Sequence, residues 1–428
     1  MEVRPNAHGR LLIWLAGLAV ASIVLVPLAV TPDAIDRFRV LKESLARATG
    51  ILGALGVVTA VSLWGTERLR AFLRHRALLA VAAAGTVWIL LTTALSTQRA
   101  YSLDSLVTFV TSLFVFITVW YAAPRLGLVI LDVLVAVVAI NAGLAALQES
   151  GRWQPFRLNP ADPLHLGTTG LIDNPNVLGS YMALAAVILT VAAIGVRGVR
   201  RWLYAFGAVC AAGAVLVSQT RGALLALAAG VVLIMIGGSV KRAVAAGVAV
   251  ALLFGIGVAV KVPAVMRLLD APRLAREEGL EVASSGRVAP VLAGLQMLRD
   301  RPVTGVGPGA FKSHYMQYKL GILDDYGRLV RGTSGMMFGE VHNDHVQILA
   351  ETGVVGYGLF VAALVALVLA VRKSSAGEPR GRIVRRLALP LAGTLVVLAL
   401  VQFPLYVPVT RHLLVVFAGL LAGWSDAE

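Results

Sequence analysis

The chain alternates between long apolar runs and shorter polar connections. An apolar run of about 17–25 residues can cross the hydrocarbon core of a bilayer as a helix. Runs of this kind occur at residues 11–30, 45–64, 77–95, 105–123, 126–147, 178–195, 202–218, 221–237, 243–262, 346–371, 387–403 and 408–424. The pattern predicts an all-α polytopic membrane protein with about twelve transmembrane helices.

The composition supports the same class of protein. Hydrophobic residues make up 58% of the 428 residues, charged residues make up 14%, and the mean hydropathy is +0.81. A soluble domain carries about 25% charged residues and cannot bury so much apolar surface. The first run, Leu11 to Val30, is too long for a signal peptide, and no small-residue cleavage site precedes Thr31. We therefore expect it to be retained as the first span.

The distribution of charge predicts the orientation of the spans. An even number of spans places both termini on one side, and the short connections on that side are rich in basic residues. Because such residues favour the cytoplasm, both termini are predicted to be cytoplasmic. The basic residues on this side are Arg4, Arg10, Arg68, Arg70, Arg74, Arg76, Arg125, Arg197, Arg200, Arg201, Lys241, Arg242, Arg372, Lys373, Arg380, Arg382, Arg385 and Arg386.

Two connections on the outer side are longer than a turn, and loops of this length are usually functional. The first, about 148–177, ends in Asp-Asn-Pro-Asn. The second, about 263–344, has helix signals from Ser284 to Asp300, a glycine turn at 305–309 and an amphipathic stretch after it. The expected division is therefore spans one to nine in 1–262, a helical outer-loop subdomain in 263–345 and the last three spans in 346–428.

Two arginines at the outer side are candidates for binding an anion. Arg221 stands at the mouth of a span, where it is either an anchor that reaches toward the interface or a guanidinium that holds phosphate. Arg287 stands at the predicted start of the outer helix, where its charge would add to the helix dipole and to free backbone N–H groups. The alternative for Arg287 is a solvated surface arginine.

A histidine cluster precedes the tenth span. His342 lies where an aqueous loop enters the bilayer, and a histidine there can exchange protons near neutral pH. A plain interfacial histidine is one alternative, and another is a metal held by His342 and His345 with Asp344 or Glu351. The chain lacks His-Glu-x-x-His and Asp-x-Asp sequences, so we expect no metal and no cofactor.

These signals resemble, together and in this order, the O-antigen ligase and polymerase superfamily of membrane glycosyltransferases. The resemblance covers about the second half of the chain, whereas the first five spans match only in hydropathy. The matching residues are Asp173–Gly179, Gln219–Leu225, Gly286-Arg287, Asp300–Phe311, His342–His345 and Glu351–Gly356.

Within this superfamily the chain is most like the lipopolysaccharide O-antigen ligases. These have an arginine followed four residues later by leucine, as Arg221 and Leu225 are, and a histidine followed eleven residues later by glycine, as His342 and Gly353 are. The polymerases tend to have two large arginine-bearing outer loops, but the first loop here is short. Some relatives also have an arginine just before the Asn-Pro-Asn motif, where this chain has His165 and Gly167. Polymerase activity stays open as the alternative.

The resemblance implies an inverting, metal-independent transfer on the periplasmic face of the bacterial inner membrane. The donor would be a glycan on undecaprenyl diphosphate, the acceptor a sugar hydroxyl of lipid A-core, and both would enter from among the membrane lipids. The catalytic residues would be Arg221 and Arg287, which hold the diphosphate, and His342, which acts as general base. Further substrate-binding residues would be Asn174, Asn176 and His345.

Two other classes compete with an enzyme. A transporter with twelve spans would place binding residues near the bilayer midplane, but the polar residues here gather at the outer face. A scaffold would not need two arginines and a histidine on one surface. The net charge of +15 follows largely from the topology, and no pattern of nucleic-acid binding occurs, so no nucleic-acid partner is expected.

Overall fold

A computed structural model describes residues 7–31, 36–65, 73, 75–153, 168–236, 263–330, 337–371 and 378–426. The described residues form helices, turns and bends without any strand, which confirms the all-α class. Among the described residues, ten helices are long and apolar enough to cross a membrane. They are α1 (Ala7–Leu28), α2 (Arg39–Trp64), α4 (Arg76–Leu95), α5 (Arg99–Leu126), α6 (Val129–Glu149), α7 (Pro175–Gly195), α8 (Val199–Val217), α15 (Asp344–Val371), α16 (Pro379–Val401) and α17 (Pro408–Asp426).

The remaining two predicted spans have different outcomes. The predicted span at 221–237 corresponds to α9 (Arg221–Ile236), which has 16 residues. At a rise of about 1.5 Å per residue this helix is about 24 Å long, which is shorter than a bilayer core of about 30 Å. The predicted span at 243–262 lies outside the described residues.

Of these ten helices α7 is the most buried, with 83% of its apolar stretch inside the protein, and it packs against α6, α8, α9, α16 and α17. Helices in lipid gain little from hydrophobic burial against each other, so they associate through close packing of small residues. Gly207 of α8 packs against Leu189 of α7, and Gly195 at the end of α7 packs against Ile383 of α16. In both places a methyl group would collide with the neighbouring side chain.

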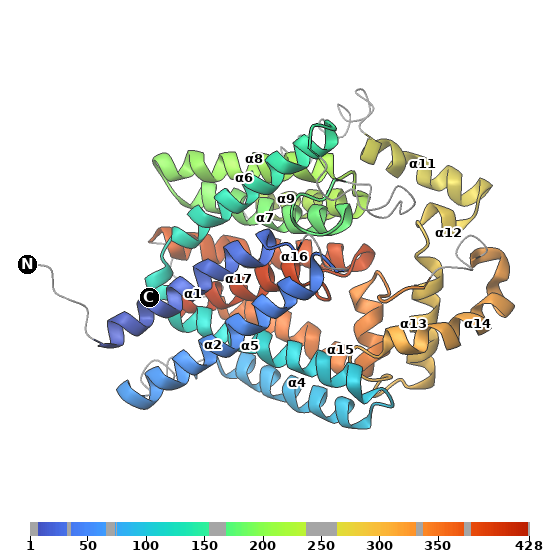
Figure 1. The fold of residues 1–428 in the computed structure, drawn as a ribbon, viewed down its shortest axis with the longest axis horizontal. Helices are drawn as coiled ribbons and strands as arrows, with labels where there is room; N and C mark the ends of the chain where they lie inside the picture. The colour runs from blue at the N-terminus through green and yellow to red at the C-terminus, as the bar shows by residue number, and fades with distance from the viewer. Residues whose placement is uncertain are drawn as a thin grey trace, which may run out of the picture.

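The outer loop has helices of its own, at the end of the molecule opposite the first residues of α1 and the end of α17 (Figure 1). They are α11 (Pro263–Glu277), α12 (Leu280–Ala283), α13 (Val288–Asp300) and α14 (Phe311–Val330). The end of α13 at Asp300 agrees with the sequence signals, and α14 follows the glycine turn where the amphipathic stretch was expected. Ala293 and Met297 of α13 pack with Phe311 and Tyr315 of α14 in a second apolar core. The division of the chain into three parts stays a prediction.

The predicted span at 346–371 is not one continuous helix. Gly353 has φ 70° and ψ −175°, which breaks α15 into two segments. A side chain at this position would collide with the backbone of Pro302 and Val303, and the N–H of Val354 donates to the Pro302 carbonyl at 2.9 Å. The first segment therefore lies with the outer turns, and only the second, 354–371, remains for the membrane. At about 1.5 Å per residue that second segment is about 27 Å long.

The glycine turn at 305–309 is held by the first segment of α15. The N–H groups of Val306 and Gly307 donate to the carbonyls of Ala350 and Glu351 at 2.9 and 3.0 Å. The buried Glu351 carboxylate accepts from the N–H of Gly309 at 2.9 Å. It also accepts from the Tyr406 hydroxyl at 2.9 Å. The turn is therefore structural, and Glu351 is its anchor.

Candidate active site

The Asn-Pro-Asn motif forms the start of α7. The Asn174 side chain caps the helix, because its Oδ1 accepts from the Val177 N–H at 3.0 Å. Pro175 occupies the first turn, where its missing N–H costs nothing. The Asn176 Oδ1 accepts from Gln402 Nε2 at 3.3 Å. Asn174 thus has a local structural role, whereas Asn176 links α7 to the segment between α16 and α17.

Arg221 is the first residue of α9, directly after Thr220, whose hydroxyl donates to the Pro175 carbonyl at 3.0 Å. The half-buried Arg221 side chain extends toward the outer helices. Its Nη2 donates to the Ala283 carbonyl and to the Ser285 hydroxyl, both at 3.0 Å. The guanidinium therefore joins α9 to the turn between α12 and α13, and it is not an anchor that faces the lipid.

Arg287 stands at the N-cap of α13, after a turn in which Ser285 and Gly286 have φ values of 58° and 83°. The Arg287 N–H donates to Ser284 Oγ at 3.1 Å, and the Val288 N–H donates to Glu281 Oε2 at 2.9 Å. We expected free N–H groups at this helix start. The expectation is wrong for the N–H groups of Arg287 and Val288, because Ser284 and Glu281 accept their hydrogen bonds.

The Arg287 guanidinium itself is half-buried, and within the described part of the chain no carboxylate or carbonyl accepts a hydrogen bond from it. Burial, together with the nearby charge of Arg221, lowers the pKa of Arg287 to about 10. The side chain stays protonated at neutral pH. A half-buried cation beside another cation is costly unless an anion joins them, so this arrangement favours an anionic ligand.

His342 is held by aromatic rings. Its backbone has φ 58°, and its ring centroid lies 4.6 Å from that of Phe403 and 5.7 Å from that of Phe338, both nearly perpendicular to it. Nδ1 is buried, and among the described residues it has no hydrogen-bond partner. Burial first, and then the charge of Arg287, lower the pKa of His342 to about 4. The imidazole is therefore neutral at neutral pH.

The charges of Arg221, Arg287 and His342 lie within range of one another: after burial, the charge of Arg221 lowers the pKa of Arg287, and the charge of Arg287 lowers the pKa of His342. The loop of His342 is fixed on its downstream side by two further bonds. Asn343 Nδ2 donates to the Leu400 carbonyl at 3.0 Å, and the Leu405 N–H donates to the buried Asp344 Oδ2 at 2.9 Å.

His345 does not join this cluster. Its Nε2 lies 3.1 Å from the Val396 carbonyl, which can only accept, so Nε2 carries the proton. Its Nδ1 then accepts from the Tyr357 hydroxyl at 3.2 Å. Both ring nitrogens are thus occupied inside the bundle, and the geometry gives His345 a role in joining α15 to α16. Its part in substrate binding stays a prediction.

Two aromatic residues of the site were missed by sequence reasoning. Phe403 stands in the linker between α16 and α17, and Phe338 stands just before the histidine loop. An aromatic residue at the end of a span is common at a membrane interface, so the sequence holds no signal that would assign Phe403 to His342.

Within the described residues, no three of His, Cys, Asp and Glu lie close enough together to hold a metal ion. The absence of a metal and of a cofactor stays a prediction. The side chains present can hold an anion between two guanidinium groups, and they can accept a proton on a neutral imidazole.

The comparisons with known proteins bear on this cluster. Residues 206–361 match the family model described as O-antigen ligase. The match begins within α8, ends within α15 and contains all three clustered residues. The search of curated proteins gives no match.

Proposed function

We propose that this chain, a member of the O-antigen ligase superfamily, transfers a glycan from undecaprenyl diphosphate to a sugar hydroxyl of lipid A-core. The superfamily makes it a multi-pass glycosyltransferase of the ligase or polymerase type. The reaction would take place on the periplasmic face of the bacterial inner membrane. The observation that carries the proposal is the proximity of Arg221, a neutral His342 and the half-buried Arg287, for which the described residues provide no acceptor.

The two arginines would bind the diphosphate of the donor. Guanidinium groups match phosphate oxygens in a bidentate geometry, and the charge on those oxygens grows as the bond to the sugar breaks. Arg221 is held in place by the Ala283 carbonyl and Ser285 before any ligand arrives. A preorganised cation loses little energy to rearrangement during the reaction, so it stabilises the leaving group well.

His342 would remove the proton of the acceptor hydroxyl. The hydroxyl oxygen forms a bond to the anomeric carbon, the carbon–oxygen bond to diphosphate breaks, and the electron pair leaves with the diphosphate. The proton goes to a ring nitrogen of His342. A single displacement of this kind inverts the anomeric configuration. No step requires a metal, because the arginines supply the positive charge.

The donor would also make His342 a better base. In the free protein, Arg287 opposes protonation of the imidazole. A bound diphosphate offsets that positive charge, so the pKa of His342 rises toward the range where a general base is effective. The base would then become strong only when the leaving group is in place.

The first test is expression of His342→Ala in a Gram-negative strain that lacks its own O-antigen ligase. The matched control is His314→Ala, an outer half-buried histidine of α14 whose Nε2 contacts the Thr97 hydroxyl at 3.2 Å. Membrane levels are compared by blotting, and lipopolysaccharide is separated on a gel. We expect the His342 variant to lose the O-antigen ladder and to accumulate lipid-linked polymer, while the control retains the ladder.

An unchanged ladder with His342→Ala would remove the general-base role. A polymerase is the alternative within the superfamily, and its acceptor would be a second lipid-linked glycan. If the wild-type protein gives no ladder in the ligase-deficient strain but restores long chains in a polymerase-deficient strain, the acceptor assignment is wrong.

A further inference from the structure

The start of α2 contacts three separate segments of the outer face, although it lies outside the family match and outside all the motifs. The buried Lys42 donates through Nζ to the carbonyls of Ala29 and Leu171, both at 2.8 Å. Leu171 stands two residues before the Asp173–Gly179 motif. Lys42 therefore holds the segment that leads into α7.

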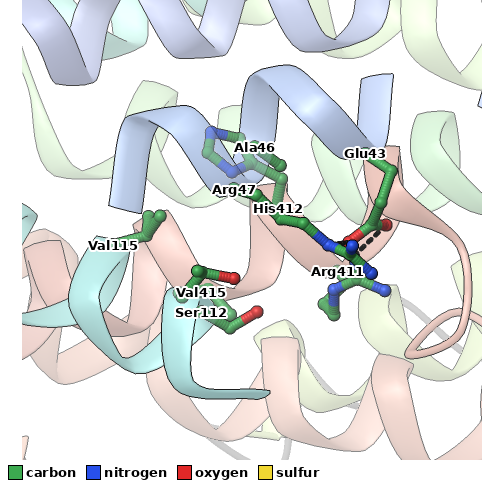
Figure 2. A pocket seen from close by; sticks show the side chains of 9 residues that line it. Glu43, Ala46, Arg47, Ser112, Val115, Arg411, His412 and Val415 are labelled. Atoms are coloured by element: carbon green, nitrogen blue, oxygen red, sulfur yellow. Dashed lines mark hydrogen bonds and ion pairs between the residues drawn. The ribbon is translucent and has the colours of Figure 1, made fainter. Parts of the chain in front are cut away.

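Glu43, one residue further along, fixes α2 against α17. Its carboxylate pairs with Arg411 of α17 and accepts from Arg47 Nε at 3.0 Å. Figure 2 shows this group around a small pocket between the helices, with His412 beside it. Arg47 and Arg411 in this pocket already pair with Glu43. The group therefore holds the helices together and is not an anion site.

Arg39, the first residue of α2, reaches the histidine loop. Its Nη2 lies 2.6 Å from Glu340 Oε1 and donates to the Tyr406 carbonyl at 3.0 Å. Glu340 precedes His342 by two residues. Tyr406 belongs to the linker that contributes Phe403, the ring packed on His342. One guanidinium therefore joins the two chain segments that hold the imidazole.

This connection matters because the imidazole of His342 makes no hydrogen bond within the described part of the chain. The orientation of the ring therefore depends on the segments that surround it. The residue has a left-handed backbone, which persists only where the surroundings enforce it. Upstream of it, the Val341 N–H donates to Gln347 Oε1 at 3.0 Å, and Glu340 pairs with Arg39. The Glu340 side chain is 17% exposed and the Arg39 side chain is 44% exposed, so the ion pair is shielded from solvent on the glutamate side and open to it on the arginine side.

We propose that Arg39 and Glu340 are positioning residues for His342, and that the first turns of α2 set the geometry of the active site. The inference rests on the proposed function, since it concerns the placement of its general base. Loss of the pair would move the imidazole relative to the acceptor hydroxyl. The diphosphate site at Arg221 and Arg287 would stay intact, because neither arginine contacts Arg39 or Glu340 among the described hydrogen bonds and ion pairs.

The test compares Arg39→Glu, Glu340→Arg and the double variant that exchanges the two charges. The control is Arg200→Glu in α8, which breaks another ion pair between helices, Arg200 with Asp132 at 3.0 Å. Full-length protein in membranes is assayed with undecaprenyl-diphosphate-linked O-antigen as donor and O-antigen-free lipopolysaccharide as acceptor. Membrane levels and melting temperatures are measured for every variant.

Each single variant is expected to lose about tenfold or more in kcat, since a small displacement of a catalytic group has effects of this size or larger. The KM for donor is expected to change by less than about twofold, because the phosphate contacts remain. The double variant should recover most of the lost kcat, and Arg200→Glu should behave as wild type. If a single variant fails to reach the membrane, Glu340→Gln, which keeps the side-chain shape, takes its place and should show the same loss in kcat.

Three results would overturn the inference. Unchanged kcat in the single variants, with His342→Ala inactive, would refute the positioning role and leave the proposed function in place. Loss of kcat without recovery in the double variant would show that the ion pair is not the cause. Normal transfer in both His342→Ala and Arg39→Glu would refute the general-base role of His342 and with it the positioning role, whereas no transfer by the wild-type protein would refute the proposed function itself.

Discussion

The guanidinium of Arg287 lies close enough to the imidazole of His342 for its charge to oppose protonation of the ring. Arg287 is a cation for which the described residues provide no acceptor, and His342 is a base that is neutral at neutral pH. Arrangements of this kind cost stability in the free protein and become favourable when an anion binds.

The dependence of activity on pH should differ between the free protein and its donor complex. In the free protein burial and Arg287 lower the pKa of His342 to about 4, so kcat/KM should hold from pH 8 to about 5 and fall toward pH 4. In the complex the diphosphate offsets Arg287, and kcat should fall at a higher pH. Initial rates between pH 4 and 8 test this. If kcat and kcat/KM fall at the same acidic pH, the prediction is wrong.

The same shift has a consequence for stability. The folded pKa of about 4 lies below the ordinary value for histidine of about 6.5, so the unfolded chain binds more protons between these pH values. The contribution of His342 to stability is therefore lost as pH falls through that window and is unchanged above it. His342→Gln should flatten this part of a plot of melting temperature against pH. If the melting temperature of His342→Gln changes with pH in parallel with that of the wild type, the pKa of His342 is not lowered in the folded protein.

Arg287→Ala and Arg221→Ala should have different effects on the melting temperature. Arg287→Ala removes a half-buried cation without an acceptor in the described chain, so the melting temperature should be unchanged or higher. Arg221→Ala loses the bonds to Ala283 and Ser285, so the melting temperature should fall. Both variants should lose about 10²–10³ in kcat if they stabilise the leaving group. A normal rate, with normal binding of lipid diphosphate, would remove the arginines from the site.

The break in α15 should depend on Gly353. An alanine there would need a left-handed backbone and would collide with Val303, so Gly353→Ala should destabilise the protein by well over about 1 kcal/mol and lower its membrane level. The control is Gly358→Ala, five residues later in the same helix, where an added methyl group meets no atom within 4 Å. This variant should be neutral or more stable by up to about 1 kcal/mol. Equal membrane levels of the two variants would show that the break is not required.

Asn174 should affect stability more than catalysis. Its side chain caps α7, and loss of such a cap costs about 1 kcal/mol. Asn174→Ala should lower the melting temperature, and Asn174→Asp, which keeps the acceptor oxygen, should restore it. The values of kcat for both should stay near that of the wild type. A large loss of kcat in both variants would instead support direct contact with substrate.

Ten of the twelve predicted spans correspond to described helices long and apolar enough to cross a membrane, because length and hydropathy alone define such helices. The break at Gly353 could not be predicted, since it lies inside an apolar run and is enforced by the distant Val303 backbone. The metal alternative would require His342 and His345, three residues apart, to lie on one helical face. They diverge because His342 has a left-handed backbone and α15 begins only at Asp344.

The sequence motifs identified Arg221, Arg287 and His342, but nothing in their spacing required the three to meet. The contacts that bring them together join residues far apart in the chain, such as Arg221 with Ala283 and His342 with Phe403. Arg39 lies further still from the motifs. A charged residue at the outer end of a span is ordinarily an interfacial group, so its contact with Glu340 has no signal in the sequence.

That the described residues provide no acceptor for Arg287 would also affect the end of the proposed catalytic cycle. A site built to stabilise diphosphate as it departs will retain the spent lipid carrier, because product and transition state present the same anion. We therefore expect undecaprenyl diphosphate to inhibit the enzyme competitively against the donor. The rate in the cell would then depend on how quickly other enzymes dephosphorylate the carrier, which links glycan transfer to the recycling of its lipid.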